Sequence, residues 1–261
     1  MALSADQIVR GNWIVRELLA KQKLKDSLEL WGDIAGYFGK EEAEQKHIAN
    51  AFLLACLLDY RRRDDSWAAV SKFLSRYPEF RNDIWRVISE TPQQEWKAAS
   101  KQYNLHWESR PHNRLWPIAV EIVYWFGGDA RCIWSDGNAI NTLTRLYWIG
   151  AGEQISRMIV GALKDCGIVS GKSDPKGDVR VCRVVGRSIL GMEIDPTNAS
   201  KAIRICREIH PTDPWKLDGP HYLLGEICRG HTPDCRNCYL REKCAYYATT
   251  IIPGAGDGSR K

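Results

Sequence analysis

Four of the nine cysteines lie in one short segment, Cys228-Arg-Gly-His-Thr-Pro-Asp-Cys235-Arg-Asn-Cys238-Tyr-Leu-Arg-Glu-Lys-Cys244, with the spacing C-x6-C-x2-C-x5-C. The segment contains too few apolar residues to fold around a core of its own, so we expect a ligated centre to replace that core. Four thiolates suit either a tetrahedral Zn²⁺ ion or an iron–sulfur cluster. Zinc ribbons usually bring together two C-x-x-C pairs from distant points, whereas this segment contains a single such pair.

The composition is that of an ordinary globular protein with room for one large or two modest domains, at 261 residues, 44% hydrophobic and 26% charged. The start of the chain lacks the basic and apolar regions of a signal peptide, and no apolar stretch reaches membrane-spanning length. We therefore expect an intracellular protein, cytoplasmic or nuclear, with reduced cysteines. The net charge of +5 is compatible with a polyanionic partner. Five cysteines fall outside the segment: Cys56, Cys132, Cys166, Cys182 and Cys206.

The cysteine spacing resembles the [4Fe-4S] loop of the endonuclease III family of helix-hairpin-helix DNA glycosylases, and all three intervals match. This resemblance implies a [4Fe-4S] cofactor held by Cys228, Cys235, Cys238 and Cys244. Zinc is the alternative occupant of the same ligands, and a disulfide framework is disfavoured in an intracellular protein.

Helical patterns dominate the chain and strand patterns are nearly absent, so the sequence predicts an all-α fold. Two segments, 47–58 and 118–126, are apolar on nearly all sides and predict buried helices, the second ended by Gly127-Gly128. Residues 1–39 predict one or two amphipathic helices whose apolar stripe is Ile8, Trp13, Ile14, Leu18 and Leu19.

Residues 137–166 predict two helices joined by the turn Ile149-Gly150-Ala151-Gly152. Glycines at such a turn allow the backbone to approach a phosphate, and the start of the next helix directs N–H groups at it. By itself, Gly-x-Gly between helices is more typical of a plain corner than of a DNA-binding hairpin. Its position before the cysteine segment favours the hairpin, because it resembles the family's Leu-Pro-Gly-Val-Gly motif, with Trp148 and Ile149 in place of Leu-Pro.

A polar loop, 170–178, precedes a predicted helix, 179–190. The segment Asp178-Val-Arg-Val-Cys-Arg-Val resembles the family's Val-Asp-Thr-His-x-x-Arg-Val, so the resemblance implies that Asp178 is the catalytic carboxylate. A plain helix cap is the alternative role, and both roles are compatible because a cap fixes the carboxylate. Asp174 is a rival in the same loop. A fixed carboxylate stabilises the positive charge that forms on deoxyribose as the N-glycosidic bond breaks, and it orients water.

Departures from the family's motifs bear on the subclass. Members with lyase activity place a lysine two residues after the second hairpin glycine, where this chain has Gln154. An amide cannot form a Schiff base, so the resemblance favours monofunctional hydrolysis. The alternatives are a bifunctional enzyme using a displaced Lys172 or Lys176, or a non-catalytic DNA-binding relative. Adenine glycosylases carry a catalytic glutamate in the helix equivalent to 47–58, where this chain has Ala55, so we do not expect adenine removal.

The resemblance also implies residues that contact DNA: Gly150 and Gly152 in the hairpin, Arg61, and Arg229 and Arg236 in the cysteine segment. Arg61 stands about where endonuclease III has a glutamine that fills the gap left by the flipped base, with a solvated surface position as an equal alternative. Glu153 places an acid near the expected phosphate and has no explanation in the motif. Candidate aromatic residues of a base pocket, each with ordinary core packing as the alternative, are Tyr60, His106, Trp107 and Trp134.

The resemblance covers about residues 45–248. It implies a six-helix barrel domain at 45–166 and an iron–sulfur domain built from 1–44 and 167–261, with a cleft between them and a disordered tail at 253–261. The expected partner is double-stranded DNA containing a modified or mismatched base, bound by a monomer, with no membrane association.

Overall fold

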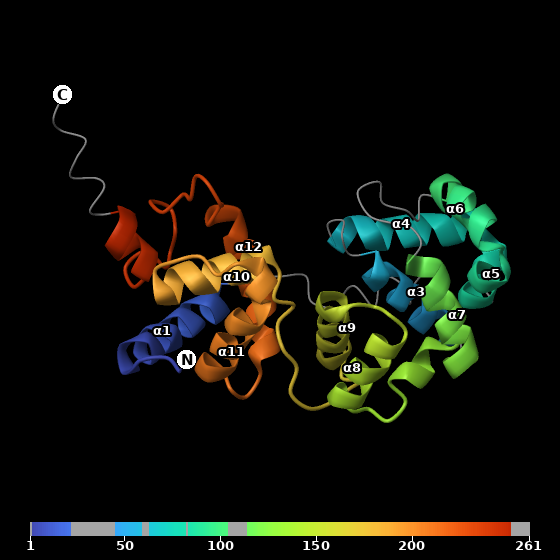
Figure 1. Ribbon diagram of the computed structural model, residues 1–261, viewed down its shortest axis with the longest axis horizontal. Coiled ribbons are helices and arrows are strands. Elements are labelled where there is room, and N and C mark those ends of the chain that lie inside the picture. Colours follow the sequence, from blue (N-terminus) through green and yellow to red (C-terminus); the bar gives the residue numbers. More distant parts are fainter. Residues whose placement is uncertain (1, 22–44, 59–62, 82, 104–113, 252–261) are drawn as a thin grey trace. The chain divides into compact units, whose positions relative to one another are not determined.

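The computed structural model describes residues 2–21, 45–58, 63–81, 83–103 and 114–251, with the backbone alone for 63–69 (Figure 1). Within these ranges the regular structure is helical and no β-strand forms; one isolated parallel bridge joins Asn138 and Ser170. The all-α prediction is therefore confirmed. None of the helices in these ranges combines the length and apolar character that crossing a membrane requires.

The chain divides into two compact units, Met1–Leu24 with Lys172–Lys261 and Lys25–Gly171. The sequence places the domain boundaries at 44/45 and 166/167. The two units divide instead at 24/25, in a stretch outside the described residues, and at 171/172, five residues after the predicted second boundary. The tail at 253–261, expected to be disordered, lies outside the described residues.

The unit Lys25–Gly171 is built around α3, Gln45–Leu57, which is buried from Ile48 to its end and confirms the predicted buried helix. Its polar Asn50 is satisfied because the side chain donates to the Gly128 carbonyl at 3.0 Å and accepts from the Ala130 N–H at 2.8 Å. Among the described residues, six α-helices follow α3 in this unit, so it contains seven rather than the six that the resemblance implies. They are α4 Arg63–Arg76, α5 Ile84–Glu90, α6 Gln93–Gln102, α7 Leu115–Phe126, α8 Ala139–Trp148 and α9 Glu153–Asp165.

The α7 helix differs from its prediction. It buries one face, through Leu115, Ile118, Ala119 and Ile122, while Tyr124 and Trp125 are 75% and 60% exposed. It is therefore amphipathic rather than buried on all sides. Apolar sequence alone does not distinguish these cases, because aromatic side chains also tolerate solvent. Gly127 ends the helix in the left-handed conformation, at φ 61°, as the glycine pair predicts.

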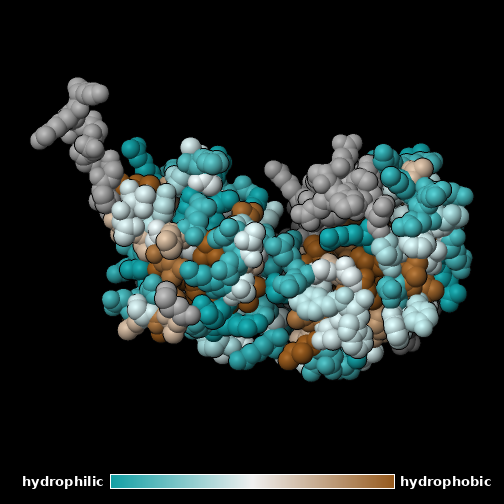
Figure 2. Space-filling view, in the orientation of Figure 1, coloured by the Kyte–Doolittle hydropathy of each residue, from teal (hydrophilic) through white to brown (hydrophobic). Residues whose placement is uncertain are grey.

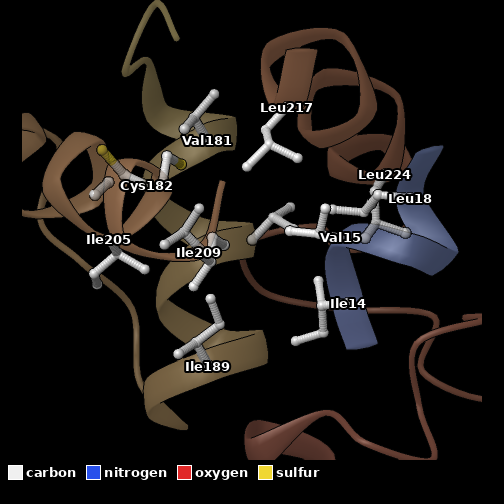
Figure 3. Close-up of a cluster of buried hydrophobic side chains, with 14 of the residues drawn as sticks. Ile14, Val15, Leu18, Val181, Cys182, Ile189, Ile205, Ile209, Leu217 and Leu224 are labelled. Carbon is white, nitrogen blue, oxygen red and sulfur yellow. The ribbon is translucent and has the colours of Figure 1, made fainter. Parts of the chain in front are cut away.

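The other unit packs α1 (Ala5–Lys21), α11 (Ala199–Ile209) and α12 (Asp218–Ile227) around α10, Val179–Val185, which continues as a π-helical segment, Gly186–Leu190. Figure 3 shows side chains from all four helices meeting in one core, including Ile14, Cys182, Ile209 and Leu224. The predicted stripe of α1 is partly wrong. Ile8 and Leu19 are 38% and 41% exposed, and the buried face is Gly11, Ile14, Val15 and Leu18, which repeats at true helical spacing.

On the face drawn in Figure 2, hydrophilic residues cover most of the surface of each unit, and apolar side chains are visible in smaller patches between them. The large apolar side chains that are most exposed are Val9, Tyr124, Trp125, Ile140, Trp148 and Met192.

His221 in α12 makes stability depend on pH. Burial lowers its pKa from 6.5 to about 4, against the raising effect of the Leu217 carbonyl. The unfolded chain binds a proton below pH 6.5 that the folded chain excludes, so the free energy of unfolding falls as pH drops from 6.5 toward 4. The loss is about 3 kcal/mol at the acid end. His221→Gln should flatten this part of a denaturation-against-pH curve, and the exposed control His231→Gln should not; equal slopes for both variants and the wild type would contradict the assignment.

Candidate functional site

The loop that leads to Asp178 is tied to its own unit at successive residues. The Ser173 carbonyl accepts from the Trp215 N–H at 3.0 Å, and the Lys176 N–H donates to Asp218 at 2.6 Å. Gly177 has φ +70° and lies so close to Ile203 that an added Cβ would stand 3.0 Å from the isoleucine Cδ1. Close packing and backbone bonds therefore hold the loop in one conformation up to the start of α10.

Asp178 caps α10, as the sequence predicts. Its Oδ1 accepts hydrogen bonds from the N–H groups of Arg180 at 2.8 Å and Val181 at 3.0 Å, and the residue is half-buried. These are two of the N–H groups that a helix start leaves without internal partners. Within the described part of the chain Oδ2 accepts no hydrogen bond, so one carboxylate oxygen is fixed and the other is available.

Asp174, the rival carboxylate, is engaged at both oxygens. Arg207 of α11 donates to its Oδ1 from Nε at 2.7 Å and to its Oδ2 from Nη2 at 2.5 Å. This bidentate ion pair neutralises the carboxylate of Asp174, so its charge is not free to stabilise a positively charged sugar. Of the two lysines in this loop, Lys172 is exposed and the backbone of Lys176 is bound to Asp218.

The predicted hairpin is present between α8 and α9. Gly150 and Gly152 have φ values of 81° and 78°, which favour glycine, and an added Cβ at Gly150 would meet nothing within 4 Å. No side chain caps the start of α9. The turn therefore leaves both an open approach to its backbone and helix N–H groups without side-chain partners, which is the chemistry of an anion site.

Residues before and after the turn fix its position. Asn138 caps α8 by accepting from the Ile140 and Asn141 N–H groups at 2.9 and 3.1 Å. The Ala139 N–H donates to the Ser170 carbonyl at 3.0 Å, which ties the start of α8 to the chain that follows α9. These bonds hold the two helices as one rigid hairpin.

The first turn of α9 contains Glu153 and Gln154. Glu153, unexplained by the motif, pairs with Arg157 one helical turn later at 2.9 Å, which offsets its charge. Gln154 is half-buried. Arg114, which no sequence motif indicated, adds a positive charge beside the turn. Its Nη1 stands 3.8 Å from the position of a Cβ on Gly152. Arg114 is distant in sequence from the hairpin, so no local pattern identifies it.

The four cysteines of the motif lie after α12 in the same unit as Asp178. All four are free and partly buried. Between Cys228 and Cys244 only Leu240 is buried, so the predicted lack of an independent core is confirmed. Backbone hydrogen bonds fold the loop into turns. One of them joins the Asp234 N–H to the Ile227 carbonyl at 3.0 Å.

Burial and the neighbouring cysteines raise the pKa values of three of the four thiols, Cys235, Cys238 and Cys244. Burial raises the pKa of Cys238 to about 11, against the lowering effect of the Leu240 N–H. Burial also raises the pKa of Cys244, opposed by the N–H groups of Tyr247 and Tyr246. The pKa of Cys235 is raised by burial and then by the neighbouring Cys244 and Cys228. The four sulfur atoms are thus close enough to interact, and backbone N–H groups already point at two of them.

The four thiols are of the ligand type that either a Zn²⁺ ion or an iron–sulfur cluster takes. In the part of the chain that the structure describes, no three His, Cys, Asp or Glu side chains are gathered as a single metal ion requires. Ligands of one ion share that atom, with Zn–S bonds of about 2.3 Å. Two buried N–H donors that face this region of the unit, Arg183 Nε and Arg187 Nε, also have no acceptor among the described residues.

Basic residues cover the outside of the cysteine loop. Arg229, Arg236, Arg241 and Lys243 are all exposed. Arg229 Nε donates to the Glu226 carbonyl at 2.9 Å, and Arg241 Nη1 donates to the Arg236 carbonyl at 2.8 Å. The arginines are therefore partly ordered while their charges face solvent.

Other predicted site residues have different outcomes. Arg61, Tyr60, His106 and Trp107 lie outside the described residues. Trp134 is 5% exposed and packs edge-on against Phe52, with ring centroids 6.4 Å apart, so it belongs to the core. Ala55 is buried in α3, where adenine glycosylases have their glutamate. Cys132 is exposed, unlike the other scattered cysteines.

These features define an all-helical protein with a helix-hairpin-helix turn. A solved structure of a trapped covalent intermediate of endonuclease III with DNA, an estranged-adenine complex, is similar to this protein. The match covers 92% of this chain and 98% of that chain, with a TM-score of 0.53 and 13% sequence identity. At this identity the likeness concerns the fold, so the chain has the helix-hairpin-helix fold of endonuclease III. No family model matches the sequence. No curated protein matches it either.

Proposed function

We propose that this protein is a monofunctional DNA glycosylase, which flips a damaged or mismatched base out of duplex DNA and hydrolyses its N-glycosidic bond. The observation that carries the proposal is the fixed carboxylate of Asp178, held at the start of α10 in a chain with the fold of endonuclease III. Flipping is required because the bond is inaccessible inside the stack.

Asp178 performs the chemistry in this proposal. Its Oδ1 is held by two backbone N–H groups, so the carboxylate needs little reorganisation during reaction. Its Oδ2 is left to face the deoxyribose, where it stabilises the developing positive charge and orients the attacking water. Asp174 is a poorer candidate because Arg207 binds both of its oxygens.

The hairpin binds the DNA backbone. Gly150 and Gly152 bring main-chain N–H groups to a phosphate, and Arg114 supplies a nearby charge. Arg229 and Arg236 on the cysteine loop provide further phosphate contacts, since their side chains are exposed and carry no part of the core. We include Arg61 as a further DNA contact only because of its position in the family motif.

Cys228, Cys235, Cys238 and Cys244 hold a [4Fe-4S] cluster in this proposal. When bound, such a cluster cross-links the loop through four iron–thiolate bonds and so replaces an apolar core. The residues of the chain supply the rest: the Leu240, Tyr246 and Tyr247 N–H groups donate to thiolate sulfur, and the exposed arginines face the DNA.

Asp178→Asn tests the catalytic role. The amide oxygen can still accept the two cap hydrogen bonds, but the charge is lost, so excision should fall by about 10²–10³-fold while duplex binding stays near wild type. The measurement is base release from a panel of duplexes containing uracil, thymine mismatches, hypoxanthine, oxidised and alkylated bases. Asp178→Ala is the folding control, because it also loses the cap and about 1 kcal/mol of stability. Wild-type excision by Asp178→Asn would move the catalytic role elsewhere.

Gln154 supports hydrolysis without strand cleavage. The solved endonuclease III complex is a trapped covalent intermediate with DNA. In this chain the position that holds a lysine in lyase members carries an amide, which cannot form an imine. The wild-type protein should therefore leave an abasic site that breaks only after alkali, and borohydride should trap no protein–DNA adduct. An adduct that disappears in Lys172→Ala or Lys176→Ala would contradict this and identify the amine.

A further inference from the structure

Arg187 is a buried charged residue that the proposed chemistry does not use. It lies in the π-helical segment after α10, and only 3% of its surface is exposed to solvent. A buried guanidinium is stable only where its donors and its charge find partners. The partners of Arg187 therefore indicate its role.

Most of these partners belong to the start of the cysteine loop. Nη1 donates to the Arg229 carbonyl at 2.6 Å and lies 3.6 Å from the Cys228 sulfur, and Nη2 donates to the Gly230 carbonyl at 2.5 Å. One rigid side chain thus holds three consecutive residues of the loop, beginning with the first expected ligand.

Other groups around Arg187 complete its environment. Glu193 pairs with Nη2, and the ring of Tyr246, two residues after the last cysteine, lies with its centroid 4.7 Å from the guanidinium carbon. The carbonyl of Arg187 accepts from the Cys244 thiol at 3.8 Å. Arg187 therefore contacts both ends of the loop, at Cys228 and at Cys244.

One donor of Arg187 has no partner. Nε is buried and finds no acceptor among the described residues. An unsatisfied buried donor typically costs about 1–3 kcal/mol, and more when the group is charged. The thiolate and sulfide sulfur atoms of an iron–sulfur cluster accept hydrogen bonds, and such bonds help to set cluster potentials. The cluster would supply the acceptor that the described residues do not provide.

We infer that Arg187 is a positioning residue for the cluster: it holds Cys228 in place for ligation and presents its Nε–H and its positive charge to the cluster's sulfur atoms. This inference rests on the [4Fe-4S] cofactor of the proposed function. Lysine cannot replace the arginine, because a single ammonium group cannot reach two carbonyls and a sulfur atom in a fixed fork. The charge also favours the reduced cluster, which is more negative than the oxidised one.

The test compares Arg187→Gln, which removes the charge, with Arg187→Lys, which keeps the charge and loses the fork. Arg204→Gln on α11 is the matched control, since it removes one arginine charge from the same unit, where the side chain is 47% exposed and faces Glu208 of its own helix. Each protein is reconstituted anaerobically with iron and sulfide. Three quantities are measured: iron per chain, the rate at which cluster absorption is lost on exposure to a chelator, and the reduction potential.

Arg187→Gln should lose its cluster about 10- to 100-fold faster than wild type, as is typical when a partner of a metal ligand is removed. Its potential should also be lower. Arg187→Lys should lose the cluster faster than wild type but keep a potential near the wild-type value, and Arg204→Gln should match wild type in both. Far-UV circular dichroism of the metal-free variants separates folding from cluster binding.

Wild-type retention and potential in Arg187→Gln would overturn the inference while leaving the cofactor in place. A potential unchanged in Arg187→Gln, with lower helix content and thermal stability in the metal-free chain, would also overturn it, because that pattern belongs to a purely structural arginine. A wild-type chain that takes up no iron would instead remove the cofactor itself, and with it the inference.

Discussion

The loop from Cys228 to Cys244 has no apolar core of its own, because Leu240 is its only buried side chain. Apolar burial at about 25 cal/mol per Å² cannot order so polar a segment, so other interactions must. The structure provides one at the start of the loop, the fork of Arg187, whose guanidinium donates to the carbonyls of Arg229 and Gly230. In the proposed function, ligation of the four cysteine thiols supplies the second constraint, and the surrounding basic surface depends on it.

A single helix connects this loop to the proposed chemistry. The α10 helix begins at the cap Asp178, and its buried Val181 and Cys182 lie in the core that Figure 3 shows. At its far end Arg183 donates to the Cys228 carbonyl at 3.4 Å. Displacement of α10 would therefore move the carboxylate and the first expected ligand together, because the helix contacts both, through the cap at Asp178 and through the Arg183 hydrogen bond to Cys228.

Local patterns in the sequence were sufficient for much of the fold. The cap at Asp178, the turn at Gly150 and the buried α3 each depend on neighbouring residues, so spacing and residue type predict them. Partners from separate helices were not predictable. Asp174 and Arg207 are 33 residues apart, and Arg187 and Cys228 are 41 apart. Errors arose where apolar residues exceed one helix face, as on α1 and α7, because burial is then decided by tertiary packing.

The metal content of anaerobically purified protein tests the central claim most directly. If Cys228, Cys235, Cys238 and Cys244 hold a [4Fe-4S] cluster, each chain should contain about four iron and four acid-labile sulfide atoms and should absorb broadly near about 400 nm. Loss of any one of these cysteines should lower all three measurements together. Stoichiometric zinc without iron or sulfide would contradict the account.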